Sequence, residues 1–154
     1  MASVGTYLNF SRNTEEAFNF YKSVFGGEFN GGIIRFNSYP APEGAPPMSP
    51  EDGNLVMHVA LPILGGHLLM GTDAPDTMGF SVKLGNNSYI CLTLDTRAQT
   101  KQLFDALSAG GKVEMELQDT SWGSYYGICA DKFGIQWMFD CAEKVWFFDI
   151  NLLF

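Results

Sequence analysis

Two histidines are the side chains of this sequence best suited to hold a metal ion. His58 and His67 are the only histidines, and both fall in stretches rich in strand-forming residues. A short hairpin connection between those strands would make the two imidazoles diagonal neighbours on one face. Alternation turns them away from Met57 and Met70, toward the helix side, and no obvious carboxylate completes a ligand set. We therefore expect packing or surface roles, although an unconventional metal site at these histidines stays open.

Three cysteines are the candidate nucleophiles. Cys91 alternates onto the face expected to line a pocket, but a thiol becomes a nucleophile only beside a base or a cation. Neither histidine is expected there, so we interpret Cys91 as a buried, inert thiol. Cys129 lies in another strand-like stretch, and Cys141 leaves an odd count without metal-type spacing. Reduced, mostly structural thiols suit a cytoplasmic protein.

The glycine-rich stretches do not form a phosphate site. Gly26-Gly27 and Gly110-Gly111 end helical patterns instead of opening them, so neither can build the cradle of backbone amides at a helix N-terminus. Asp131-Lys-Phe-Gly134 falls between two strands, which predicts a turn whose glycine takes a positive φ. The sequence thus predicts no nucleotide and no other cofactor.

The composition of the chain argues against several classes of binding partner. The 154 residues carry a net charge of −8 with nine Lys and Arg, so no basic stripe is available to neutralise nucleic-acid phosphates. The N-terminus lacks a signal-peptide pattern, and no apolar run approaches the roughly 18 residues that span a bilayer. We expect a soluble, cytoplasmic protein with no membrane or nucleic-acid partner. Thirteen Phe and seven Met suit an apolar pocket or a dimer interface.

The elements that would position these residues follow one pattern, used twice. In the first half, a strand over 4–10 precedes a helix with Asn13 as N-cap and Glu16 in the capping-box position. Strands are then expected over 28–39, 54–61 and 67–72, with an exposed proline-rich loop over 40–50 and a hairpin turn over 62–66.

The same order returns after a linker over 73–86. Thr96, with Gln99 in the capping-box position, opens the second helix. The expected strands of this half are 88–94, 112–117, 125–130 and 135–140. We therefore predict an α+β fold in which two βαβββ modules, about 4–73 and 87–141, form a curved mixed sheet with a concave cleft. One domain would span 1–141, followed by an apolar C-terminal extension over 142–154.

Several motifs in this order resemble one known family. They are Tyr7-Leu-Asn-Phe10, Glu15-Glu-Ala-Phe-Asn-Phe-Tyr-Lys-Ser-Val-Phe-Gly-Gly-Glu28, Leu69-Met-Gly-Thr-Asp73, Trp122-Gly-Ser-Tyr-Tyr-Gly127 and Asp131-Lys-Phe-Gly-Ile-Gln-Trp-Met138. Together they resemble the PhnB-like branch of the vicinal-oxygen-chelate superfamily, which includes glyoxalases, bleomycin-resistance proteins and dioxygenases. The resemblance covers roughly residues 4 to 141, and it implies the glyoxalase/bleomycin-resistance fold and a homodimer.

The resemblance also implies where a metal would bind in the metal-dependent members. Matching by motif puts those ligand positions near Thr6, Met70, Tyr89 and Met138. A hydroxyl, a phenol and two thioethers form a poor set for zinc, nickel or iron, which prefer imidazole, carboxylate or thiolate donors. We therefore expect no metal at these positions.

Alternation predicts an apolar, methionine-rich cup on the concave face. Polar tips from Thr6, Tyr89 and Gln136 would orient a small guest in it. The predicted ligand-binding residues are Thr6, Leu8, Met57, Met70, Tyr89, Cys91, Trp122, Tyr125, Gln136 and Met138. A collapsed interior without ligand is the alternative. Trp122 and Tyr125 would form a wall of the cup or, equally, seal the core or a dimer contact.

Three functions remain open from the sequence. The first is a homodimeric, metal-free binding protein for a small apolar or aromatic molecule, as bleomycin-resistance relatives sequester drugs. The second is an enzyme of the glyoxalase/dioxygenase superfamily, or one with the demethylubiquinone methyltransferase label that relatives of this group have carried. The sequence shows no glycine-rich strand-to-helix turn for a nucleoside cofactor, so it favours binding over catalysis, and we predict no catalytic residues. The third is a structural or interaction module without ligand.

The tail from Val145 would pack as an added strand, or be an atypical extension of the family pattern.

Overall fold

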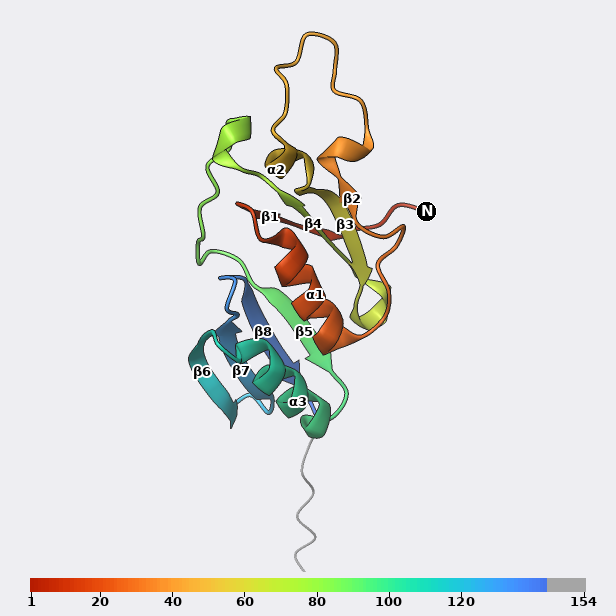
Figure 1. Ribbon diagram of the computed structural model, residues 1–154. Coiled ribbons are helices and arrows are strands. Elements are labelled where there is room, and N and C mark those ends of the chain that lie inside the picture. The colour runs from red at the N-terminus through yellow and green to blue at the C-terminus, as the bar shows by residue number, and fades with distance from the viewer. Residues whose placement is uncertain (144–154) are drawn as a thin grey trace, which may run out of the picture. The chain divides into compact units, whose positions relative to one another are not determined.

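The computed structural model describes residues 1–143, in two compact units that divide after Lys83 (Figure 1). Each unit holds one four-stranded mixed sheet with one long helix against it. The predicted apolar extension from residue 144 onward lies outside the described residues. None of the described helices is long and apolar enough to cross a membrane.

The first unit contains one βαβββ module. Its elements are β1 (Thr6–Phe10), α1 (Thr14–Phe25), β2 (Ile34–Arg35), the 3₁₀ turn η1 (Phe36–Ser38), α2 (Pro50–Gly53), β3 (Val56–Pro62), η2 (Leu64–Gly66), β4 (Leu68–Asp73) and η3 (Asp76–Met78). The sheet order is β1-β4-β3-β2. β1 runs parallel to β4, whereas β3 is antiparallel to both β4 and β2. The hairpin predicted over 62–66 is therefore confirmed.

Aromatic residues at helical spacing fix α1 on its sheet. Ala17, Phe18 and Tyr21 are fully buried on the inner face of the helix. The Phe18 ring lies directly over Gly71 of β4, where any side chain would collide with it. Phe18 also meets Phe10 edge to face, with ring centroids 6.4 Å apart. The core of the first unit therefore lies between α1 and this face of the sheet.

The start of α1 differs from the sequence prediction. Asn13 precedes the helix but makes no side-chain cap hydrogen bond. Its place is taken by the buried carboxylate of Asp73, which accepts hydrogen bonds from the Thr14 amide at 3.0 Å and the Thr14 hydroxyl at 2.8 Å. The other oxygen of Asp73 accepts from the Val56 amide at 2.8 Å. One carboxylate thus joins α1, β3 and β4, a tertiary contact that local capping rules cannot see.

The strand predicted over 28–39 is mostly wrong. Only Ile34–Arg35 is extended in a ladder, and a 3₁₀ turn follows at once. Gly31 and Gly32 take φ of 74° and 73°, and the Gly32 amide donates to the Phe29 carbonyl, so the chain turns where a strand was expected. The proline-rich loop is exposed, as predicted, and it ends in the short α2.

The second unit repeats the module. It comprises β5 (Ile90–Leu94), α3 (Arg97–Ser108), β6 (Lys112–Asp119), β7 (Tyr125–Ala130) and β8 (Gln136–Cys141). The sheet order is β5-β8-β7-β6, with β5 parallel to β8 and the other pairs antiparallel. The predicted strands are confirmed with small shifts at their ends. Two βαβββ modules of the α+β class are therefore present.

In the second unit, the helix cap and the turn predicted from local sequence signals are both confirmed. The Thr96 hydroxyl caps α3 by accepting from the Gln99 amide at 3.1 Å, as predicted. The turn at Asp131 is also confirmed: the Gly134 amide donates to the Asp131 carbonyl, and Gly134 has φ of 85°. The buried Asp131 carboxylate accepts from Phe133, Ile135 and the indole of Trp137, so this motif serves structure.

Candidate functional site

The first sheet has two chemically different faces. Leu69, Gly71 and Asp73 of β4 turn toward α1, and the alternate residues turn the other way. Register places Met70 between Tyr7 of β1 and Ala60 of β3 on that second side. We call this side, defined by Tyr7, Asn9, Ala60, Met70 and Thr72, the first open face.

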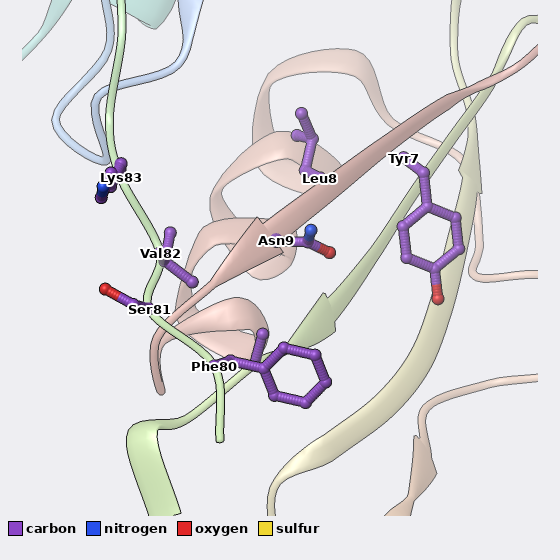
Figure 2. Close-up of a pocket in the computed structure, with 8 residues that line it drawn as sticks. Tyr7, Leu8, Asn9, Phe80, Ser81, Val82 and Lys83 are labelled. Carbon is purple, nitrogen blue, oxygen red and sulfur yellow. The ribbon is translucent and has the colours of Figure 1, made fainter. Parts of the chain in front are cut away.

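A groove of about 340 Å³ lies beside β1 on the first open face (Figure 2). It is lined by Tyr7, Leu8, Asn9, Ala74, Phe80, Ser81, Val82 and Lys83. In the view of Figure 2, the Asn9 amide has the Tyr7 ring to its right and the Phe80 ring below it. Both rings are large exposed surfaces, 49% and 54% accessible. Because apolar rings of this size cost free energy in water, the pair offers a ready contact for a flat guest.

The phenol of Tyr7 is held in place from the neighbouring strands. Its hydroxyl lies 3.1 Å from Nδ1 of His58, and the two rings are 5.8 Å apart. Burial raises the pKa of Tyr7 above its ordinary value, against the opposing effect of a hydrogen bond with Thr72. The Tyr7 hydroxyl therefore stays neutral at physiological pH and remains able to donate or accept a hydrogen bond.

The two histidines lie differently from the sequence expectation. His58 contacts Tyr7 on the first open face, not the helix side. His67 precedes β4 at the hairpin, where its Nε2 lies 2.8 Å from the Thr6 hydroxyl. His58 stands at the opposite end of the β3–β4 ladder, so the predicted diagonal pair is wrong. The ladder runs from the Val59–Gly71 pair to the Pro62–Leu68 pair, so it separates His58, just before it, from His67 at the turn.

The predicted cup residues of the first unit do not share one face. Thr6 and Leu8 pair with Leu69 and Gly71, which puts them on the side of α1, whereas Met70 pairs with Tyr7. Figure 2 shows the Leu8 side chain leaving β1 toward α1, although Leu8 still borders the groove. Met57 is half-buried on β3. The role of all four in ligand binding stays a prediction.

The second sheet aligns Cys91 and two methionines in one row. Register aligns Cys91 of β5, Met138 of β8, Ile128 of β7 and Met115 of β6, on the side opposite Phe139, which packs on Phe104 of α3. We call this row, with the parallel row of Thr93, Asp140, Tyr126 and Gln118, the second open face. Of the predicted cup residues, Cys91 and Met138 thus lie side by side.

Cys91 is exposed, which corrects the expectation of a buried thiol. Its strand is at the edge of the sheet, and β5 has a neighbour on one side only within the second unit. Desolvation and the nearby charge of Asp140 nevertheless raise the pKa of Cys91 above the ordinary thiol value. Because the thiolate is the nucleophile, the Cys91 environment disfavours covalent catalysis.

Tyr89 and Gln136, the predicted polar tips of this unit, are engaged within it. The Tyr89 hydroxyl donates to the Glu114 carboxylate at 3.1 Å, and this hydrogen bond raises the pKa of Tyr89. The buried Gln136 side chain donates to the Ser88 carbonyl at 2.8 Å, which ties the segment before β5 to β8. Of these two side chains, the buried Gln136 has the clearer structural role.

Trp122 and Tyr125 separate onto different sides. Trp122 is 68% exposed and meets Tyr126 edge to face at 5.8 Å. Tyr125 pairs with Cys141 on the helix side of the sheet, where the Arg97 guanidinium covers its ring at 3.9 Å. Arg97 also forms a salt bridge with Asp119. Tyr126, one residue beyond the predicted position, is the aromatic residue of the second open face.

The donors at the expected metal positions do not fit a metal of the family type. The expected positions Thr6, Met70, Tyr89 and Met138 offer a hydroxyl, a phenol and two thioethers, and register pairs Met70 with Tyr7 and Met138 with Cys91. Hydroxyl, phenol and thioether groups are weak ligands for zinc, nickel or iron. No group of three or more His, Cys, Asp or Glu side chains is placed to hold a metal within residues 1–143.

Sequence reasoning missed most of the groove. Alternation that places the neighbours Thr6 and Leu8 in the pocket predicts the other face for Tyr7 and Asn9, and Phe80 and Lys83 fall in the linker expected over 73–86. An exposed aromatic residue in a linker is the one signal that could have drawn attention to Phe80. Which strand the linker follows is a tertiary property that the local sequence does not determine.

Comparison with known proteins places this geometry in a family. The model of the Glyoxalase/Bleomycin resistance protein/Dioxygenase superfamily matches residues 4–139. Protein YjdN of Escherichia coli (strain K12) is 28% identical over 146 residues, which cover 90% of this chain and 94% of that protein.

Solved structures agree with this family match. Protein PA1353 from Pseudomonas aeruginosa is 29% identical with a TM-score of 0.78, over 94% of this chain and all of that one. A PhnB protein from Bacillus cereus is 25% identical with a TM-score of 0.68, over 92% of this chain and all of that one. The chain therefore belongs to the glyoxalase/bleomycin-resistance/dioxygenase superfamily and has PhnB-like and YjdN homologues.

Proposed function

We propose that this protein binds small apolar or aromatic molecules without the help of a metal ion. The observation that carries the proposal is the groove on the first open face, where the exposed rings of Tyr7 and Phe80 share the lining with the Asn9 amide. Its volume, about 340 Å³, is at the lower end of the range for small-molecule sites. A one- or two-ring compound fits that space.

The chemistry of the remaining candidates supports binding over catalysis. A catalytic base or nucleophile needs a pKa near the working pH, yet the raised pKa values of Tyr7, Tyr89 and Cys91 move these groups away from it. The Bacillus cereus relative carries a provisional 3-demethylubiquinone-9 3-methyltransferase description. In this chain, Ser11-Arg12-Asn13 and Asp95-Thr96 precede the two long helices, and neither is a glycine-rich turn for a nucleoside cofactor.

A thermal-shift screen tests the proposal directly. The purified chain, treated with EDTA and dialysed, is heated with a panel of one- and two-ring aromatic compounds and of short aliphatic ones. A ligand at one hundred times its Kd adds about 2.7 kcal/mol to the free energy of unfolding, so genuine ligands raise Tm by several degrees. We expect such stabilisation by aromatic compounds in the absence of metal.

Two comparisons make the screen decisive. Adding nickel, zinc, iron or manganese should leave both Tm and ligand affinity unchanged, whereas binding that appears only with a metal would overturn the metal-free proposal. The variant Phe80→Ala removes one exposed ring of the groove and should weaken the hits, while Trp122→Ala removes an exposed ring of the second unit and serves as its control. No stabilisation by any compound would contradict the binding function.

The homodimer and the cytoplasmic location expected from the sequence stay predictions. A second copy would extend the binding role if it covered an open face, because Val113 and Met115 of the edge strand β6 are exposed apolar side chains. The groove itself is complete within residues 1–83, so the proposed function does not depend on the dimer.

A further inference from the structure

The charge of the groove is opposite to that of the protein. The whole chain has a net charge of −8. The groove is lined by one cation, Lys83, and by no carboxylate. A positively charged lining in an acidic protein attracts anions locally.

Lys83 differs from most of the described cations. Arg12, Lys22, Arg35, Arg97 and Lys101 each form a salt bridge with a carboxylate. Lys83 forms none with any residue in the described part of the chain. Its ammonium group is thus available to an anionic ligand without first breaking an internal pair.

The acidic residues closest in sequence to the groove form hydrogen bonds outside it. Asp73, next to the lining residue Ala74, is buried on the side of α1 and accepts three hydrogen bonds there. Asp76 caps the amide of Thr77 at 2.9 Å in η3. Neither carboxylate lines the groove, so neither neutralises Lys83 within it.

The rest of the lining supplies an aromatic contact and a polar anchor. The Asn9 amide lines the groove together with the Tyr7 and Phe80 rings and makes no side-chain hydrogen bond within residues 1–143 (Figure 2). It can therefore donate to an oxygen of a guest. Tyr7 stays uncharged because burial raises its pKa, so its ring does not repel an anion.

From this arrangement we propose that the groove selects aromatic carboxylates, with the ring against Tyr7 and Phe80 and the carboxylate held by Lys83 and the Asn9 amide. The inference rests on the proposed binding function and adds the chemical class of the ligand. A neutral aromatic compound of the same shape uses the rings but gains nothing from the ammonium group, so the charge of the ligand decides between them.

Isothermal titration calorimetry with two matched probes tests this selectivity. 2-Naphthoate and 2-naphthamide have the same ring and nearly the same shape, and they differ in charge. For the full-length protein in low salt, we expect 2-naphthoate to bind about fivefold more tightly, the size of effect typical of an exposed ion pair. The preference should shrink in 0.5 M NaCl, because salt screens an exposed charge.

Variants locate the effect. Lys83→Met should abolish the preference for 2-naphthoate and leave 2-naphthamide unchanged. Lys112→Met is the matched control, because Lys112 is an exposed lysine of β6 that also forms no salt bridge among the described residues. Phe80→Ala should weaken both probes by the same factor.

The outcomes separate this inference from the proposed function. Equal affinity for the two probes, or a preference that survives in Lys83→Met, would overturn the carboxylate selectivity and leave aromatic binding intact. No binding of either probe would overturn it too, and the compound screen would then decide the binding function alone. A preference lost equally in Lys83→Met and Lys112→Met would reduce the effect to the net charge of the protein and would also contradict the inference.

Discussion

Cys91 shows how exposure and reactivity separate at the scale of one residue. Its thiol is exposed on the second open face, where a reagent or a ligand can reach it. Desolvation and the charge of Asp140 raise its pKa, so little thiolate forms at neutral pH. Cys129 is fully buried, and burial raises its pKa to about 12. The surroundings of both thiols favour the protonated form.

Alkylation should therefore discriminate between the cysteines. With iodoacetamide at pH 7, we expect the folded protein to be modified slowly at Cys91 and not at Cys129 or Cys141, as read by mass spectrometry of peptides. Asp140→Asn removes a charge that opposes the thiolate and should speed modification of Cys91 by about threefold. Modification of Cys129 at the same rate as Cys91 in the folded protein would contradict this account of their environments.

A shift of one residue decides which side chains of β1 meet a ligand. Leu8 and Phe10 are the apolar members of the strand, and the structure packs Phe10 against Phe18 beneath α1. The sequence-based assignment gave Leu8 to the pocket because an apolar pocket was expected there. In a strand with one helix-covered face, the most apolar residues go to the core, which leaves Tyr7 and Asn9 for the open face.

At the scale of elements, the two long helices begin in different ways. α3 is capped by its own Thr96, a local signal that the sequence predicts correctly. α1 is capped from a distance by Asp73, which is the last residue of β4 and also holds the Val56 amide. Because this contact joins residues 59 positions apart, no local capping rule could have found it.

Two alanine variants measure this difference. Asp73→Ala leaves the buried Thr14 and Val56 donors without their acceptor, and we expect the free energy of unfolding to fall by about 3 kcal/mol. Asn13→Ala, at the position that the sequence predicted as the cap, should cost less than about 0.5 kcal/mol. Chemical denaturation followed by circular dichroism gives both values. A larger loss for Asn13→Ala than for Asp73→Ala would show that the helix is capped locally after all.

At the scale of the whole molecule, the repeat is what the sequence predicts best. Hydrophobic periodicity and the two glycine pairs indicated both βαβββ modules, and the strands over Tyr125–Ala130 match the prediction residue for residue. The strand over 28–39 failed because Gly31 and Gly32 turn the chain in the left-handed region. Composition and periodicity predict the fold because each module must bury one face of its helix on one face of its sheet.

The groove could not be predicted in the same way. It forms where the segment 80–83 passes β1, and it combines residues about seventy positions apart in the sequence. Its character also differs from the apolar, methionine-rich cup that alternation favoured, because the lining includes an amide and an ammonium group. The sequence predicted aromatic residues in the binding site, and the groove contains two, Tyr7 and Phe80. Neither of them was among the predicted binding residues.

The measurement that tests the central claim most directly is a nuclear magnetic resonance titration of the ¹⁵N-labelled, EDTA-treated protein with 2-naphthamide. The account predicts saturable shifts concentrated at the amides of residues 7–9 and 80–83 and at the side-chain amide of Asn9, with β6 unaffected. Saturable shifts confined to the second unit, or none until a metal ion is added, would contradict a metal-free aromatic site in this groove.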